Sequence, residues 1–172
     1  NTSLHIAVQK GNMNICKMIM EEVIEIDAQN LAGLSPIHEA AKYGHVEIYK
    51  LLIEKGFDKE PRDITGKSPF HYSASLGHLG LCCLMILGGC SLDSTDKSGN
   101  RPIHLAAEYD HFKTCELLMD NITDVNPKNK LGTTPLHYLA QNGHFDLCRM
   151  IIRKISDKNP KDQDGNTPLH EA

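Results

Sequence analysis

The chain has 172 residues, 40% of them apolar and 23% charged, which is typical of a folded, soluble protein. Its formal net charge of −4 argues against a nucleic-acid-binding protein, because binding to phosphate backbones needs a basic face. No apolar run approaches the roughly 18 residues needed to cross a bilayer, so we expect no membrane insertion by this segment.

One short motif recurs along the chain at a spacing of 33 residues. It consists of Ser or Thr, then Pro, an apolar residue and His. Its copies end at His5, His38, His71, His104, His137 and His170. The first copy, Thr2-Ser3-Leu4-His5, lacks the proline. A fixed period of about 20–50 residues indicates an array of repeats, each of which buries its apolar face only against its neighbours.

Each period carries the same order of local signals. It opens with Asn or Asp three residues before Gly, a pairing typical of a turn. Ser35-Pro36 then predicts a helix start, with a hydroxyl N-cap and proline at the first helical position. We expect this helix over residues 35–43, ended by Gly44-His45, because glycine adopts the left-handed conformation that closes many helices. A second helix is expected over residues 46–55.

These signals divide the chain into a single array of repeats. We expect a partial repeat at 1–29, complete repeats at 30–62, 63–95, 96–128 and 129–161, and a partial repeat at 162–172. Terminal repeats normally carry a polar outer face, but Leu4, Ile6, Val8, Met13 and Ile15 are placed as in an internal repeat, and Glu171-Ala172 falls within a helix. We therefore expect the array to be a fragment of a longer one.

The motif Gly132-Thr133-Thr134-Pro135-Leu136-His137, followed by Asn142-Gly143-His144, resembles the ankyrin repeat, whose period is also about 33 residues. The resemblance covers the whole chain. It implies an all-α ankyrin-repeat solenoid of stacked antiparallel helix pairs, with a β-hairpin-like loop at each junction. It also implies that the signature histidine links the hairpin backbone to the helix by hydrogen bonds.

Repeat 96–128 departs most from the common pattern. Arg101 replaces the capping hydroxyl, a change that typically costs about 0.5–2 kcal/mol of stability. Asp110 replaces the glycine between the helices, and it tolerates the left-handed conformation less well. The glycine that closes the second helix is also replaced in three repeats, by Val23, Ile122 and Ile155. We expect repeat 96–128 to be the least stable of the complete repeats.

The six cysteines and ten histidines raise the questions of disulfides and of a metal site. Four cysteines share one position of the period: Cys16, Cys82, Cys115 and Cys148. Equivalent positions in neighbouring repeats lie about 8–10 Å apart, whereas disulfide Cα atoms lie within about 7 Å. We expect buried, reduced thiols and therefore a cytoplasmic protein, with the nucleus as the alternative. The histidines spread evenly along the stack, so we expect no metal and no cofactor.

The residues that vary between repeats are the candidates for binding. The resemblance places partner contacts beside each hairpin glycine and before the glycine between the helices. The candidates are Leu31, Leu34, Tyr43, Ile64, Lys67, Leu76, Lys97, Asn100, Tyr109, Lys130, Leu131 and Thr133. Aromatic and aliphatic residues in a row with lysines nearby are typical of a protein-binding surface. The alternative is that single exposed apolar residues are normal on any surface.

The second helix of repeat 63–95 is unusually apolar. At three positions where other repeats carry charged residues it has Gly80, Cys83 and Leu87, and residues 79–90 include no charge. Two interpretations stay open: this face is covered by another part of a larger protein or by a partner, or the sequence has drifted in a tolerant helix. We expect Cys83 to be the most reactive thiol because of its exposure.

The sequence thus predicts a non-catalytic module that binds a protein or peptide partner on its concave face. No nucleophile elbow, phosphate-binding loop or dinucleotide fingerprint is present, so we do not expect an enzyme. The alternative is a structural spacer or a regulatory ankyrin array within a larger enzyme or ion channel. As a separate segment the chain is expected to be monomeric.

Overall fold

The computed structural model describes residues 1–22 and 28–172, so Val23 lies outside the described residues. The described chain forms eleven α-helices and no strand. The inner row consists of α1 (Ser3–Gln9), α3 (Pro36–Tyr43), α5 (Pro69–Ser75), α7 (Pro102–Glu108), α9 (Pro135–Gln141) and α11 (Pro168–Glu171). The outer row consists of α2 (Met13–Glu22), α4 (Val46–Glu54), α6 (Leu79–Leu87), α8 (Phe112–Asn121) and α10 (Phe145–Lys154).

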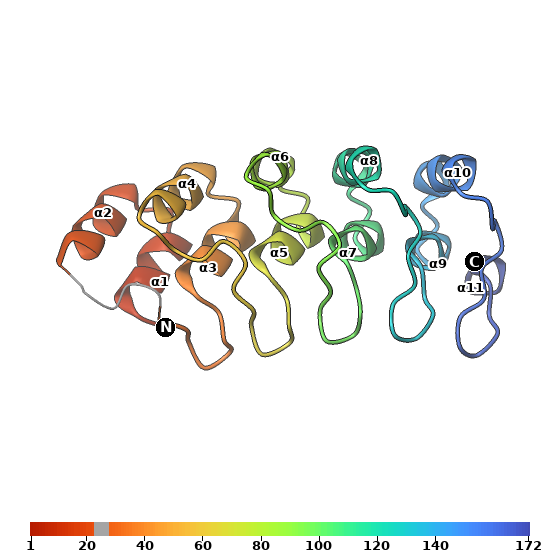
Figure 1. Ribbon diagram of the computed structural model, residues 1–172, viewed down its shortest axis with the longest axis horizontal. Coiled ribbons are helices and arrows are strands. Elements are labelled where there is room, and N and C mark those ends of the chain that lie inside the picture. The colour runs from red at the N-terminus through yellow and green to blue at the C-terminus, as the bar shows by residue number, and fades with distance from the viewer. Residues whose placement is uncertain (23–27) are drawn as a thin grey trace.

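The two rows run side by side along the molecule, and the hairpin loops project beyond the inner row (Figure 1). Each inner helix packs against the next inner helix and against the outer helix that follows it in the chain. Neighbouring outer helices make fewer contacts with one another than neighbouring inner helices do. The predicted all-α solenoid of stacked helix pairs is therefore confirmed, and its inner row is the more closely packed layer.

Local sequence determines where the helices of each pair begin and end. Ser35 has the extended conformation of an N-cap residue, with φ −95° and ψ 167°, and Pro36 occupies the first helical position. The helix ends at Tyr43, after which Gly44 adopts φ +70°. The expected helices at 35–43 and 46–55 thus agree with α3 and α4 to within one residue at each end.

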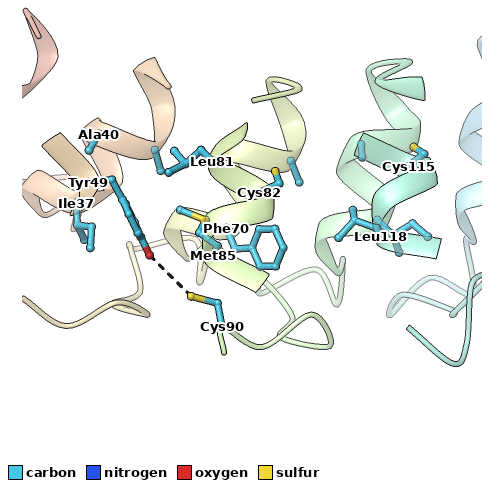
Figure 2. Close-up of a cluster of buried hydrophobic side chains, with 14 of the residues drawn as sticks. Ile37, Ala40, Tyr49, Phe70, Leu81, Cys82, Met85, Cys90, Cys115 and Leu118 are labelled. Carbon is cyan, nitrogen blue, oxygen red and sulfur yellow. Dashed lines mark hydrogen bonds between the residues drawn. The ribbon is translucent and has the colours of Figure 1, made fainter. Parts of the chain in front are cut away.

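The apolar core lies between the two rows and continues from one repeat to the next. Figure 2 shows its middle section, where Ile37, Phe70 and Leu118 come from successive helix pairs. The phenol of Tyr49 is buried in this core, and its hydroxyl lies 3.8 Å from Sγ of Cys90. Burial raises the pKa of the Tyr49 hydroxyl, so the phenol stays neutral. A continuous core of this kind stabilises neighbouring repeats jointly.

The signature histidines link each helix pair to the hairpin that follows. The backbone N–H of Ser35 donates to Nδ1 of His38 over 3.1 Å, while Nε2 of the same ring lies 3.1 Å from the carbonyl oxygen of Lys67. His71 makes the same pair of contacts, the second to Asn100 O. Because Nδ1 accepts a hydrogen bond, the proton lies on Nε2, which donates to the next hairpin. The link therefore requires a neutral ring.

Repeat 96–128 forms this link differently. The Nε2 atom of His104 lies 3.0 Å from the carbonyl oxygen of Pro127, which precedes the turn of the next hairpin. Arg101 offers only its backbone N–H to the His104 ring, over 3.0 Å, and its guanidinium pairs with Asp93 over 2.7 Å. The capping hydroxyl that contacts the signature ring in the other repeats is thus absent here, as the sequence indicated.

A second set of histidines links each repeat to the one before it. Nε2 of His78 lies 3.0 Å from Lys42 O, and the imidazole packs so closely on Gly44 that a Cβ there would lie 2.7 Å from Nδ1. In repeat 96–128 the position of Gly44 is occupied by Asp110, which adopts φ +56°. Its carboxylate lies 3.2 Å from Nδ1 of His144, so a contact between two side chains replaces the backbone link.

The signature histidines predict a loss of stability in mild acid. Burial lowers the pKa of His71 to about 4, whereas the unfolded residue titrates near 6.5. Between these values unfolding takes up a proton, so the free energy of unfolding falls as the pH decreases through this window. At pH 5 the loss is about 2 kcal/mol for this ring. Urea denaturation at pH 7 and pH 5 measures it.

In that measurement His71→Ala is expected to lower the free energy of unfolding at pH 7, since it removes a buried hydrogen-bonded ring. The additional decrease between pH 7 and pH 5 is expected to be about 2 kcal/mol smaller in His71→Ala than in the wild type. His170→Ala serves as the control because His170 is exposed. An unchanged difference between pH 7 and pH 5 in His71→Ala would show that this ring is not the titrating group.

Repeat 96–128 is predicted to gain stability when its cap is restored. Arg101→Thr supplies the hydroxyl of the other repeats and is expected to raise the free energy of unfolding by about 1 kcal/mol. Arg101→Ala is the matched control, since it removes the exposed pair with Asp93 without adding a hydroxyl.

Hydrogen exchange is expected to show α7 and α8 as the least protected complete helix pair, and highest protection there would contradict the prediction.

Candidate protein-binding surface

The hairpin conformation is fixed by the Asn or Asp that opens each turn. Oδ1 of Asp63 accepts the backbone N–H groups of Thr65 and Lys67 over 2.8 and 2.9 Å. Gly66, at φ +80°, supplies the left-handed residue of the turn. Although burial raises the pKa of the Asp63 carboxyl, hydrogen bonds from Tyr72 and the turn lower it overall. The carboxylate is therefore occupied within its own hairpin.

Backbone hydrogen bonds join neighbouring hairpins into one row. The N–H of Ile64 donates to Ala32 O over 3.1 Å, and the N–H of Lys97 donates to Thr65 O over 2.8 Å. The same bond recurs further along, from Lys130 to the hairpin before it. In Figure 1 the hairpins accordingly lie next to one another below the inner helices. The tips thus form a continuous edge along the solenoid.

The inner helices contribute side chains to the same face as the hairpins. The hydroxyl of Tyr72 donates to Oδ2 of Asp63 over 2.6 Å, so this side of α5 faces the hairpin. Leu76 lies one helical turn after Tyr72 and therefore on the same side. The corresponding residues at the ends of α3 and α7 are Tyr43 and Tyr109. We call this surface the hairpin face, and it consists of Leu31, Tyr43, Ile64, Leu76, Lys97, Tyr109, Lys130 and Leu131.

Most predicted binding residues are exposed on the hairpin face. Leu31 is fully exposed, and the exposed fractions of Tyr109, Ile64 and Leu131 are 57%, 59% and 63%. Tyr43, Leu76, Lys97 and Lys130 are exposed as well. Lys67, Asn100 and Thr133 are half-buried. The aromatic and aliphatic candidates other than Leu34 are thus exposed to solvent.

The prediction is wrong for Leu34, whose side chain is buried. The carbonyl oxygen of this residue lies 2.7 Å from Nε2 of His5, and its N–H donates to Oδ1 of Asn30. Leu34 directly precedes the capping residue Ser35, where the chain turns back toward the helices. Its backbone therefore belongs to the link between two repeats, and its side chain is not available to a partner.

A side chain that the sequence analysis did not single out orients Tyr43. Nε2 of Gln9 donates to the Tyr43 hydroxyl over 2.6 Å, and the ring stacks on His45 with 6.2 Å between ring centroids. Nζ of Lys42 lies 5.8 Å from the centre of the phenol ring. The 34-residue separation of Gln9 and Tyr43 was the available signal, because it places them at adjacent positions of neighbouring repeats. Tyr43 is consequently held in place before any partner binds.

The apolar outer helix α6 is also exposed. Leu87 has an exposed fraction of 86%, Gly80 is exposed and Cys83 is half-buried. A cavity of about 200 Å³ lies between α4 and α6 and is lined by residues that include Ile53 and Leu84. This is a second apolar region, on the opposite row of helices from the hairpin face.

The described part of the chain holds no group of three or more His, Cys, Asp and Glu side chains placed to bind a metal ion. All six cysteines are free thiols. Among residues 1–22 and 28–172, no helix is both long and apolar enough to cross a bilayer.

Paired helices, stacked in two rows and joined by hairpins, define a helical-repeat protein. The family model described as ankyrin repeats (3 copies) matches residues 4–96, 60–129 and 103–172, which together span nearly the whole chain. The chain therefore belongs to the ankyrin repeat family. Ankyrin repeats are generally protein–protein interaction modules and are typically non-catalytic. None of the curated proteins matches the chain.

Thiol reactivity is predicted to differ among the cysteines. Burial raises the pKa of Cys82 to about 11 and that of Cys115 to about 12, which keeps both as poorly nucleophilic thiols. Cys83 is half-buried on the outer side of α6 and is expected to react with iodoacetamide before either of them. Peptide mapping by mass spectrometry after brief labelling measures the order. Faster labelling of Cys82 or Cys115 in the folded chain would contradict it, and labelling in urea provides the unfolded reference.

Proposed function

We propose that the chain is a non-catalytic recognition module whose hairpin face, on the concave side of the solenoid, binds a protein or peptide partner. The observation that carries this proposal is the exposed series Tyr43, Leu76 and Tyr109, one residue at the C-terminal end of each of three successive inner helices. Aromatic and aliphatic side chains grouped on one face are characteristic of binding surfaces. Membership of a family of interaction modules supports the same conclusion.

The rigidity of the face favours binding. The hairpins are joined by backbone hydrogen bonds, and Tyr43 is held by Gln9 and His45. Fixing these side chains before binding reduces the conformational entropy lost on association. A repeated scaffold of this kind also offers an extended surface that a long segment of a partner contacts at several repeats.

The six free thiols are consistent with a reducing compartment, so we place the module in the cytoplasm, with the nucleus as the alternative. We also propose that this segment acts as a monomer. Size-exclusion chromatography with light scattering measures its mass in solution, and a concentration-independent dimer would contradict the monomer.

The proposal predicts that peptide binding depends on the hairpin face. Random 16-residue peptides are selected by display on the immobilised chain, and the enriched peptides are then measured by fluorescence anisotropy. The triple variant Tyr43→Ala, Leu76→Ala, Tyr109→Ala is expected to weaken binding at least tenfold, since it removes three exposed anchors. Its helical circular dichroism is expected to match that of the wild type, because all three side chains are substantially exposed.

A matched control removes the same kind of side chains from other surfaces. Ile15→Ala, Met18→Ala, Phe145→Ala deletes three exposed apolar groups of α2 and α10 and is expected to leave binding unchanged. If the hairpin-face variant also binds normally, the recognition proposal fails. That result would favour the alternative of a structural spacer, or of a regulatory array within a larger enzyme or ion channel.

A further inference from the structure

The hairpin tips change chemical character along the row. The residue that follows the opening Asn or Asp is Leu31, then Ile64, Lys97 and Lys130 in successive hairpins. We propose that the hairpin face binds an extended acidic segment, with apolar side chains against the first two tips and carboxylates against the next two. This inference deepens the proposed function and rests on it, because it specifies the chemistry of the partner.

The two lysines offer their charges to a partner. Both are exposed, and neither ammonium has an ion-pair or hydrogen-bond partner within the described residues. By contrast, Lys50 and Lys154 on outer helices pair with acidic side chains over 2.8 Å. Free ammonium groups make charge-assisted hydrogen bonds to incoming carboxylates without first breaking a pair.

Close packing fixes the position of the first side-chain atoms of both lysines. The Cγ atom of Lys97 lies 3.2 Å from the place a Cβ would take on Gly66, and Cγ of Lys130 lies 3.0 Å from the same place on Gly99. The methylene stems thus lie over the glycines of the preceding hairpins, while the ammonium groups extend to solvent. Each lysine is therefore seated at the junction of two hairpins, on the line that the tips form.

The carboxylate nearest Lys97 in its own hairpin is engaged in the turn, and the hairpin of Lys130 has no carboxylate. Oδ1 of Asp96 accepts the N–H groups of Ser98 and Asn100 over 2.9 and 2.8 Å, and the residue is buried. The next turn is opened by Asn129 in place of an aspartate, so hairpin 127–133 carries two lysines and no acidic residue. This local excess of positive charge stands against a chain whose net charge is −4.

The spacing of the tips sets the spacing of the partner's side chains. Neighbouring hairpins are hydrogen-bonded and each contributes two strand-like segments, so successive tips lie roughly 10 Å apart. A segment in the polyproline II conformation repeats every three residues, about 9 Å. Side chains three residues apart therefore meet successive tips. The expected partner carries two apolar residues and then two acidic residues at this interval, in either chain direction.

The display selection described above tests this inference through the composition of the enriched peptides. Peptides selected on the wild type are expected to carry pairs of Asp or Glu three residues apart, next to aliphatic or aromatic residues. Their affinity is expected to fall at least tenfold for Lys97→Glu, Lys130→Glu and to weaken in 0.5 M salt, since charges on an exposed face are screened. A second selection on this double variant is expected to enrich Lys or Arg at the same interval.

The control Lys17→Glu, Lys113→Glu makes the same change in net charge on outer helices and is expected to leave affinity unchanged. Peptides without acidic enrichment, or affinities within twofold for Lys97→Glu, Lys130→Glu, would overturn the acidic-partner inference. If those peptides still depend on Tyr43, Leu76 and Tyr109, the recognition function survives that failure. If no enriched peptide depends on these three residues, both are overturned.

Discussion

The stacked arrangement depends on a neutral imidazole placed between each helix pair and the next hairpin. Its Nδ1 accepts from the residue that caps the helix, and its Nε2 donates to a backbone carbonyl of the following hairpin, as His38 does to Lys67. One ring thus stabilises a helix start, a hairpin and a junction together. Its removal leaves buried backbone groups without partners, at a cost of about 1–3 kcal/mol for each group.

The second series of histidines makes the opposite connection, from each repeat back to the one before. Glycine is needed between the helices for two reasons, as Gly44 shows. It adopts a left-handed conformation, and the ring of His78 packs on it so closely that a side chain would not fit. Asp110 meets the first requirement only partly, because a β-carbon at φ +56° is strained. In place of the packed ring it contacts His144 through its carboxylate, so one junction is held by a contact between two side chains.

Sequence reasoning accounted for those features that each repeat determines locally. Ser35-Pro36 was sufficient to place a helix start, and the spacing of the cysteines was sufficient to exclude disulfides among the four that share one position. It failed for Leu34, whose side chain is buried and whose backbone carbonyl is contacted by His5 of another repeat, because that placement involves two repeats together. The pairing of Asp110 with His144 also joins two repeats, and so required their relative placement.

The division between structure and recognition follows from this network. Histidine, cap and turn residues are constrained by partners in two repeats, so they contribute little that could distinguish one ligand from another. The side chains of Leu31, Tyr109 and Lys130 project from the same scaffold without taking part in the repeated links. Burying an exposed leucine side chain stabilises a complex by roughly 1.5–3 kcal/mol, and an ammonium adds orientation through charge. In the proposed function, affinity and specificity therefore arise from side chains that the fold leaves free, while the repeated residues hold them at a fixed spacing.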